Sequence, residues 1–269
     1  MNPEENRLSA LFPDVAAQLR AALSNLHMVA QQLVPEERRE QDPLLDAKAA
    51  LLDQSYYQML RLVNGLSASA CLTSEEPFAL QDRDLVELVG TICERAGDLA
   101  PLLGLELRFV CAPERLICAV APDMLEQLLY HLLSNAFKFT PAGGTVTVEL
   151  QVKGKQVQLA VEDTGRGISE DRLEALFDRY LQAGQRDPAP HGLGLGLALC
   201  RRIAEGHGGA LMASSKEGKG SRFVLALPNR QLGGNVSDVS FDYAGGFNRT
   251  LLGLADALPP KAFLVRYQD

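Results

Sequence analysis

Apolar residues in the first 70 positions recur at alternating intervals of four and three residues. This spacing is typical of a heptad seam, along which helices pack against other helices. One series precedes Pro35, and a second resumes after Pro43. The two series are Phe12, Ala16, Leu19, Leu23, Leu26, Ala30 and Leu33, then Leu45, Ala49, Leu52, Tyr56, Met59, Val63, Leu66 and Ala70.

Two long helices are therefore predicted. Pro13 and Asp14 suit the start of the first, Pro35 suits its end, and a polar loop at 36–42 would connect the two as an antiparallel hairpin. One hairpin offers too little surface to cover a continuous apolar seam, whereas two hairpins packed as a four-helix bundle would bury it. We therefore expect a homodimer. The alternative is that the hairpin folds back on the C-terminal part of its own chain.

Beyond a linker at 73–77 the pattern mixes helices with short strands. Helices are expected over 84–99, 123–139, 173–181 and 195–206, strands over 105–111, 116–120, 145–152, 157–161, 210–214 and 222–227, and a loop over 182–190. This order predicts an α+β fold, in which the helical hairpin precedes an α/β sandwich with a mixed, largely antiparallel sheet.

Three regions follow from this pattern. The hairpin occupies 1–75, the sandwich 76–229, and an extension of unknown role 230–269, which would be a packing or dimer-extending element. In the extension, partial alternation over 236–243 precedes an expected helix over 250–258 and an expected terminal strand over 263–267.

Composition narrows the classes of function. The net charge of −8 argues against nucleic acid or an anionic membrane as the main partner. No apolar run is long enough to span a bilayer, and the N-terminus lacks the features of a secretory signal, so a cytoplasmic location is expected. The cysteines are odd in number and scattered, which favours buried reduced thiols over disulfides or a metal site.

Two glycine motifs carry the candidate chemistry. Asp163 ends a predicted strand, where its carboxylate can accept a hydrogen bond from an exocyclic amine such as that of adenine, and Gly165 and Gly167 permit close approach of a base. This motif alone also fits a calcium loop or a plain turn. The second motif immediately precedes a helix whose free amides favour phosphate, although a flexible loop with close helix packing would fit too. It comprises Gly192, Gly194, Leu195 and Gly196.

A third motif lies on the helix expected over 123–139. Asn135 and Lys138 are three positions apart and share a helix face. A carboxamide oxygen can bind Mg²⁺ that bridges phosphates, and a lysine can neutralise phosphate charge. Taken alone, the same pattern also fits an amphipathic helix with a solvated polar face.

Together these motifs resemble the ATP-binding catalytic domain of sensor histidine kinases, which belongs to the superfamily shared with gyrase, the Hsp90 chaperones and MutL. The resemblance covers about 77–228 and includes segments similar to the N box (132–140), the first glycine box (163–168), the F box (176–180), the second glycine box (192–197) and the closing strand (220–225).

By this resemblance, Asn135 would hold Mg²⁺, Asp163 would bind adenine, the glycines of the second motif would line the phosphates, and 181–191 would form a short lid. His131 departs from the family pattern, because many histidine kinases carry asparagine there and related ATPases carry the glutamate that activates water. A histidine could polarise a nucleophile or simply replace a ligand.

The hairpin resembles the dimerisation and phosphoacceptor domain of the same kinases. Asp14, Val15, Leu19, Arg20 and Leu23 agree with its signature, but the phosphoacceptor histidine is replaced by Ala17, the adjacent acid by Gln18 and the proline by Ala22. Position 17 lies beside the seam and should face solvent. The other histidine of the hairpin, His27, has no acid near it in sequence to orient it, which favours an ordinary surface residue over a substitute phosphoacceptor.

The resemblance implies a histidine kinase-like signal-transduction protein that binds Mg-ATP, dimerises through the hairpin and acts with a response regulator or partner kinase. Because an alanine methyl group cannot accept phosphate, transfer would reach a histidine on another protein or a different site. The alternative is a pseudokinase or scaffold that regulates a partner without phosphotransfer. A serine kinase of the anti-sigma type, or an ATPase of the same superfamily, is a third interpretation, against which the long hairpin argues.

Overall fold

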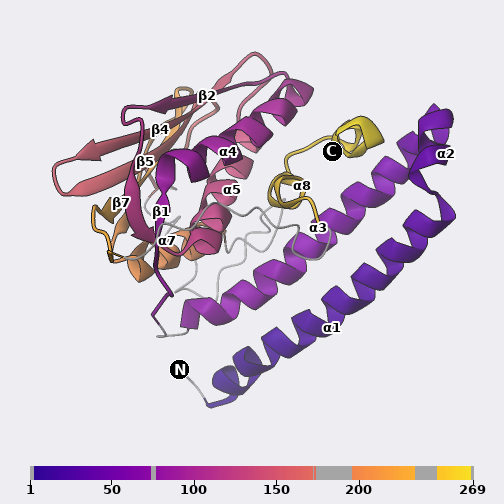
Figure 1. The fold of residues 1–269 in the computed structure, drawn as a ribbon, viewed down its shortest axis with the longest axis horizontal. Helices are drawn as coiled ribbons and strands as arrows, with labels where there is room; N and C mark the ends of the chain where they lie inside the picture. The colour runs from indigo at the N-terminus through magenta and orange to yellow at the C-terminus, as the bar shows by residue number, and fades with distance from the viewer. Residues whose placement is uncertain (1–2, 74–76, 172, 174–195, 234–246, 268–269) are drawn as a thin grey trace.

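The computed structural model describes residues 3–73, 77–171, 173, 196–233 and 247–267, with the backbone alone for 3–13 and 66–73. A long helical hairpin lies beside a sandwich of helices and a sheet (Figure 1). The described helices are α1 (Pro3–Leu33), α2 (Glu36–Gln41), α3 (Pro43–Thr73), α4 (Leu85–Leu99), α5 (Pro122–Phe139), α7 (Gly196–Gly206) and α8 (Arg249–Leu254). The strands are β1 (Gln81–Asp84), β2 (Glu106–Cys111), β3 (Ile117–Val120), β4 (Thr145–Lys153), β5 (Gln156–Asp163), β6 (Ala210–Lys216) and β7 (Gly220–Pro228).

The hairpin differs from its prediction at two points. α1 begins at Pro3, so Pro13 lies within the helix instead of starting it, because residues before Pro13 such as Leu8 and Ala10 favour helix. The segment expected as a loop at 36–42 contains α2. Its first turn is acidic and its last turn basic, which suits the helix dipole.

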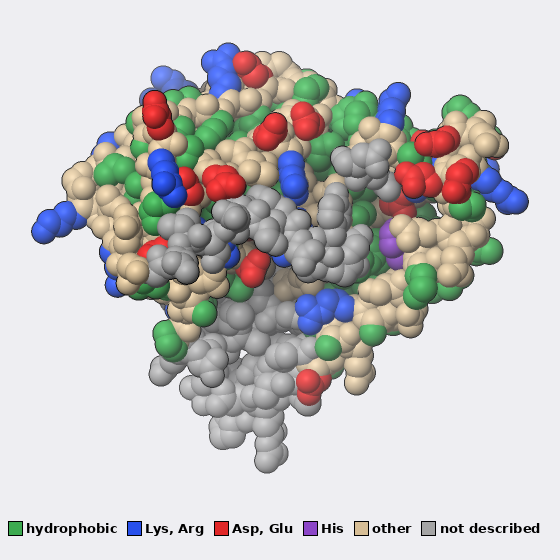
Figure 2. Space-filling view, in the orientation of Figure 1, with side chains coloured by type: hydrophobic (Ala, Val, Ile, Leu, Met, Phe, Trp, Pro, Cys, Tyr) green, Lys and Arg blue, Asp and Glu red, His purple; other side chains and the backbone are tan. Residues whose placement is uncertain are grey.

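The heptad seam is divided between two environments. Ala16 on α1 is fully buried against α3, whereas Leu19, Leu26 and Leu33 on the same seam are 44%, 68% and 70% exposed. On α3, Tyr56 is buried, and Leu52 and Met59 remain exposed. Hydrophobic side chains therefore reach the surface along the outer edge of the hairpin (Figure 2).

The main sheet has the strand order β2-β4-β5-β7-β6, and every pairing except the parallel pair β2-β4 is antiparallel. This confirms the mixed sheet. Helices α4, α5 and α7 lie between the sheet and the hairpin (Figure 1). Leu128, Leu129, Leu132 and Leu133 of α5 are fully buried and form the centre of the core.

β1 is a strand that the pattern did not predict, because its sequence Gln-Asp-Arg-Asp has no apolar alternation. It pairs with β3 in a separate two-stranded sheet. Asp82 of β1 is buried and accepts hydrogen bonds from the amides of Leu232 (2.8 Å) and Gly233 (2.9 Å). Side chain–backbone bonding of this kind leaves no signal in hydrophobic spacing.

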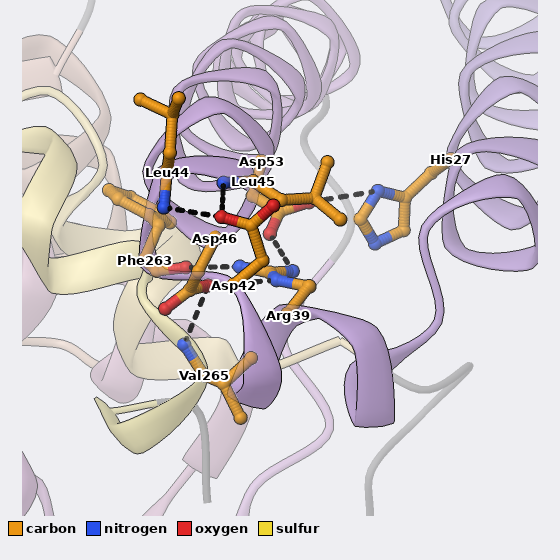
Figure 3. A network of polar contacts seen from close by, with 9 residues as sticks. All are labelled: His27, Arg39, Asp42, Leu44, Leu45, Asp46, Asp53, Phe263 and Val265. Carbon is orange, nitrogen blue, oxygen red and sulfur yellow. Dashed lines mark hydrogen bonds and ion pairs between the residues drawn. The ribbon is translucent and has the colours of Figure 1, made fainter.

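The described end of the chain, 247–267, packs against α3 and α5 (Figure 1). The strand expected over 263–267 is wrong, because the chain forms two 3₁₀ helices, Pro260–Phe263 and Val265–Tyr267. Side chains of the hairpin form hydrogen bonds with backbone groups that would otherwise pair with a neighbouring strand. Arg39 donates to the carbonyl oxygen of Phe263 at 2.9 Å, and the amide of Val265 donates to Asp46 at 3.4 Å (Figure 3).

Cys93, Cys118 and Cys200 are buried free thiols, as expected, whereas the free thiol of Cys111 is only half-buried. Cys93 lies in the core, where burial raises the pKa of its thiol to about 12. It is therefore a structural apolar group rather than a nucleophile. No helix in the described ranges combines the length and the apolar character needed to cross a membrane.

Candidate functional site

Asp163 is the last residue of β5 and is buried. Its carboxylate accepts a hydrogen bond from the amide of Gly165 at 2.8 Å, which fixes the orientation of the side chain. Burial raises the pKa of the Asp163 carboxyl, while backbone hydrogen bonds from Gly165 and Ser221 oppose that rise. The site thus contains an oriented carboxylate in an apolar setting, which suits recognition of a hydrogen-bond donor.

The glycines after Asp163 are required by contacts within the protein. A Cβ at Gly165 would lie 2.3 Å from the carbonyl oxygen of Phe139, at the end of α5. Gly167 has a φ of 69°, and a Cβ there would lie 2.1 Å from the carbonyl oxygen of Lys216. The turn after β5 is therefore pressed against the end of α5 and the β6–β7 turn. These glycines, expected to give a base close access, are thus also required by packing within the protein.

α5 carries the other described candidates. Asn135 and Lys138 are both half-buried. The ammonium of Lys138 lies 3.3 Å from the carboxylate of Asp256, a residue of the C-terminal segment. Burial lowers the pKa of the Lys138 ammonium, and Asp256 opposes that effect. The lysine expected to neutralise phosphate therefore faces an acid of its own chain.

His131 lies one turn before Asn135 on the same helix. Its Nδ1 atom is 3.4 Å from the guanidinium of Arg61 on α3, and a Cβ at Gly196 would lie 3.1 Å from the same atom. Burial lowers the pKa of His131 to about 4, with a further lowering from Arg61. The imidazole is therefore neutral near pH 7, and a donating Arg61 requires its proton to be on Nε2. His131 connects the hairpin to the start of α7.

A cavity of about 560 Å³ lies between the hairpin, α5 and α8. Asn135 and Asp163 are not among the described residues that line it, so it is a neighbour of the predicted nucleotide site and not the site itself. Its lining includes arginines from three elements together with a histidine, a tyrosine and a glutamate: Arg20, Arg61, Arg249, His131, Tyr130 and Glu126.

The hairpin positions Ala17 as expected. Ala17 is exposed, next to the fully buried Ala16. The prediction for His27 is wrong, because its side chain is only 12% exposed and stacks on Tyr56 with ring centroids 4.0 Å apart. Its Nδ1 atom lies 3.7 Å from Asp53, an acid that comes from α3 and so could not be seen in the neighbouring sequence (Figure 3).

Several predicted positions lie outside the described residues. These are Gly192, Gly194 and Leu195 of the second glycine motif, the F box at 176–180, the lid at 181–191, the helix over 173–181 with the following loop, and the alternation over 236–243. Of the second motif, the structure describes Gly196, which begins α7.

Comparison with known proteins agrees with this fold. Residues 120–231 match the family described as histidine kinase-, DNA gyrase B-, and HSP90-like ATPase. Over 108 residues (40% of this chain and 28% of the relative), the sequence is 41% identical to the adaptive-response sensory kinase SasA of Synechococcus elongatus. Over 217 residues (80% of this chain and 37% of the relative), it is 29% identical to the sensor protein SrrB of Staphylococcus aureus.

Solved structures show the same fold. Full-length ShkA in complex with AMPPNP superposes with a TM-score of 0.65, covering 86% of this chain and 47% of ShkA at 24% identity. The histidine kinase AdeS of Acinetobacter baumannii superposes with a TM-score of 0.52, covering 77% of this chain and 95% of AdeS at 17% identity. The chain spans only about a third of the length of the curated relatives SasA and SrrB.

The fold and the matching region define an ATP-binding domain of the class shared by histidine kinases, DNA gyrase B and HSP90. Within that class, the similarity to SasA and SrrB supports a catalytic domain of the histidine kinase type in this chain.

Two residues near the candidate site escaped sequence reasoning. Arg61 contacts both His131 and Asp256, and Asp256 contacts Lys138. These residues are separated by long stretches of chain and belong to no motif. A single charged residue in a helix or a short extension gives no signal that it reaches another domain.

Proposed function

We propose that this chain is a dimeric, histidine kinase-like signal-transduction protein that binds Mg-ATP and lacks a phosphoacceptor in its own hairpin. The main support for the nucleotide site is the buried carboxylate of Asp163 at the end of β5, which accepts a hydrogen bond from the amide of Gly165. A carboxylate in this state recognises a donor such as the adenine amine, because it would otherwise remain poorly solvated.

The remaining ligands follow from the helices around that carboxylate. Asn135 would hold Mg²⁺ through its carboxamide oxygen, and Lys138 would approach the phosphates. Gly196 begins α7, whose first amides would complete the phosphate site with those of Gly192, Gly194 and Leu195. His131 is neutral and bonded to Arg61, which favours a connecting role over that of a proton acceptor.

Two measurements on the purified chain test this function. Titration calorimetry with Mg-ATP should show saturable binding, and absence of heat at millimolar nucleotide would contradict the site. Radiolabelled ATP should leave the chain itself unlabelled at the hairpin, since Ala17 has no nucleophilic atom. Acid-labile label on an added kinase or response regulator would show transfer to another protein.

The pseudokinase is the second candidate, and two observations favour it. Ala17 is exposed where a phosphoacceptor would have to be, and Lys138 is paired with Asp256. In this case the chain would bind nucleotide and regulate a partner kinase or response regulator through its surface. Saturable ATP binding without label on any added partner would support this candidate over phosphotransfer.

Dimerisation is supported by the exposed half of the heptad seam. Leu19, Leu26 and Leu33 form one apolar row on α1, and Leu52 and Met59 extend it on α3. A second hairpin packed against these rows would bury them in a four-helix bundle. The opposite side of α3 already packs on the C-terminal segment of its own chain, so the second copy is proposed on the outer side.

Replacing Leu26 with glutamate should convert the dimer to a monomer at micromolar concentration, because a charge would be buried in the apolar interface. Light scattering coupled to size-exclusion chromatography measures the mass directly. The matched control is Gln31→Glu, which adds the same charge at an exposed polar position of α1. A Leu26→Glu chain with the mass of the unchanged protein would place the dimer interface elsewhere.

Restoring the missing nucleophile is a further test. Ala17→His should give acid-labile radiolabel on the hairpin where the unchanged chain gives none, because an exposed imidazole at this position can attack the γ-phosphorus. Ala17→Gln, which supplies polarity without a nucleophile, is the control. Absence of label in Ala17→His with normal ATP binding would show that more than the nucleophile is missing, as a pseudokinase requires.

A further inference from the structure

Residues 248–267, here called the C-terminal clasp, contact α5 closely. The hydroxyl groups of Tyr130 and Thr250 are 2.7 Å apart, and the guanidinium of Arg249 lies 2.7 Å from Glu126. A Cβ at Gly253 would lie 2.4 Å from the ring of Tyr130, so only glycine allows this approach. One side of the clasp is therefore seated on the helix that carries Asn135 and Lys138.

The other side of the clasp is bound by α3 of the hairpin. Gln54 donates to the carbonyl oxygen of Leu258 at 2.9 Å, and Gln58 donates to that of Ala255 at 3.3 Å. Arg61 donates to the carbonyl oxygen of Gly253. Positions 54, 58 and 61 lie along one stripe of a helix. The clasp thus joins the hairpin to the ATP-binding domain through specific polar contacts.

Asp256 lies where the two sides meet. Its Oδ2 atom is 3.3 Å from Nζ of Lys138 and 3.3 Å from Nε of Arg61. The three side chains are between 12% and 23% exposed, so solvent screens their attraction less than at an open surface. One carboxylate thereby holds the lysine of the proposed phosphate site and an arginine of the hairpin.

We propose that Asp256 is an internal competitor of nucleotide phosphate for Lys138, so that Mg-ATP binding and closure of the C-terminal clasp oppose each other. This inference rests on the proposed nucleotide site. Phosphate oxygens approaching Lys138 would meet the negative charge of Asp256, and Lys138 would have to exchange one anionic partner for the other. The two equilibria are coupled, so the clasp weakens nucleotide binding by the same factor by which nucleotide opens the clasp.

The exchange also reaches the hairpin. Once Asp256 leaves Lys138, Arg61 loses the carboxylate that the two cations shared, while His131 still faces its guanidinium. The clasp is then held by fewer charged contacts between α3 and α5. Nucleotide occupancy is in this way transmitted to the contact between the ATP-binding domain and the hairpin.

Calorimetry on the full chain tests this competition. Asp256→Asn should bind Mg-ATP about tenfold more tightly than the unchanged protein, within the range usual for coupling between sites. Asp256→Glu, which keeps the charge, should stay close to the unchanged affinity. Asp98→Asn removes an exposed carboxylate of α4 and should have no effect. Thermal unfolding of each variant verifies that it is folded.

Hydrogen exchange of the amides of α8 gives a second readout that does not require nucleotide. Exchange should be faster in nucleotide-free Asp256→Asn than in the unchanged chain, and Mg-ATP should accelerate it in the unchanged chain. Equal affinity of the two chains, or weaker binding by Asp256→Asn, would overturn the inference and leave the proposed function standing. No binding by either chain would overturn both.

Discussion

Replacing Asp163 with asparagine is expected to lower the affinity for Mg-ATP by about 100-fold or more. One carboxylate oxygen of Asp163 accepts from the amide of Gly165 at 2.8 Å. In Asp163→Asn the backbone amide of Gly165 would still donate to the carboxamide oxygen of the side chain. The NH₂ group of the carboxamide would then point toward the nucleotide. Two donors, the carboxamide and the adenine amine, would then face each other in a buried site, which costs roughly 3 kcal/mol. Titration calorimetry measures the change.

Glu162→Gln is the matched control, since Glu162 is the preceding, exposed carboxylate of β5 and its ion-pair partner is Arg222. It should bind Mg-ATP as the unchanged chain does. Nucleotide binding by Asp163→Asn within threefold of the unchanged chain would remove Asp163 from the site. Circular dichroism verifies that both variants keep the fold.

The pH dependence of binding follows from the same carboxylate. Burial raises the pKa of Asp163, so it becomes protonated at a higher pH than an ordinary aspartate. Protonation turns an acceptor into a donor. Affinity for Mg-ATP should therefore be complete above this raised pKa and should fall as the pH decreases through it, before the ordinary aspartate range is reached. Glu162→Gln should show a profile of the same shape displaced to lower pH, because the negative charge of Glu162 contributes to the raised pKa of Asp163.

The sequence was informative where residues close together in the chain form a regular pattern or a motif. The heptad spacing predicted both long helices, but it did not indicate which seam positions, such as Leu26, stay exposed in the single chain. The alternating strands predicted the mixed sheet. Asp163 and the glycines after it were recognisable because a turn that is pressed against other backbone requires glycine at fixed positions.

The sequence was uninformative where long-range polar contacts decide the structure. β1 has no apolar pattern and is fixed by pairing with β3. The chain end at 263–267 is held in 3₁₀ helices by hairpin side chains more than 200 positions away. Asp256 meets Lys138 and Arg61 for the same reason, since no local rule indicates which distant charge a residue will face.

Arg39→Met is expected to lower the free energy of unfolding by about 3–5 kcal/mol. Arg39 is buried at the closed end of the hairpin, with its guanidinium 2.9 Å from Asp46, 2.7 Å from Asp53 and 2.9 Å from the carbonyl oxygen of Phe263 (Figure 3). Methionine has a similar size but no charge. The buried carboxylate of Asp53 would lose the cation that faces it, which is the costly half of breaking a buried ion pair. Urea denaturation measures the difference.

Arg38→Met is the matched control, because Arg38 is the exposed neighbour on α2 and its loss should change the free energy of unfolding by less than about 0.5 kcal/mol. The double variant Arg39→Met/Asp53→Leu should regain part of the lost stability, since it also removes the buried carboxylate that faced Arg39. A double variant no more stable than Arg39→Met would show that the bond to Phe263 and packing, not charge, explain the effect.

The histidine beside this cluster sets the pH dependence of the Arg39→Met effect. Burial lowers the pKa of His27, Asp53 raises it and Arg39 lowers it further. Without Arg39, the pKa of His27 should rise, and a protonated His27 would supply Asp53 with a cation 3.7 Å away. In the unchanged chain the lowered pKa of His27 costs stability as the pH falls below the ordinary histidine range, and this cost should be smaller in Arg39→Met because the pKa of His27 is lowered less. The stability difference between Arg39→Met and the unchanged chain should therefore shrink as the pH falls through the range in which His27 becomes protonated. A difference that is constant with pH would contradict this coupling.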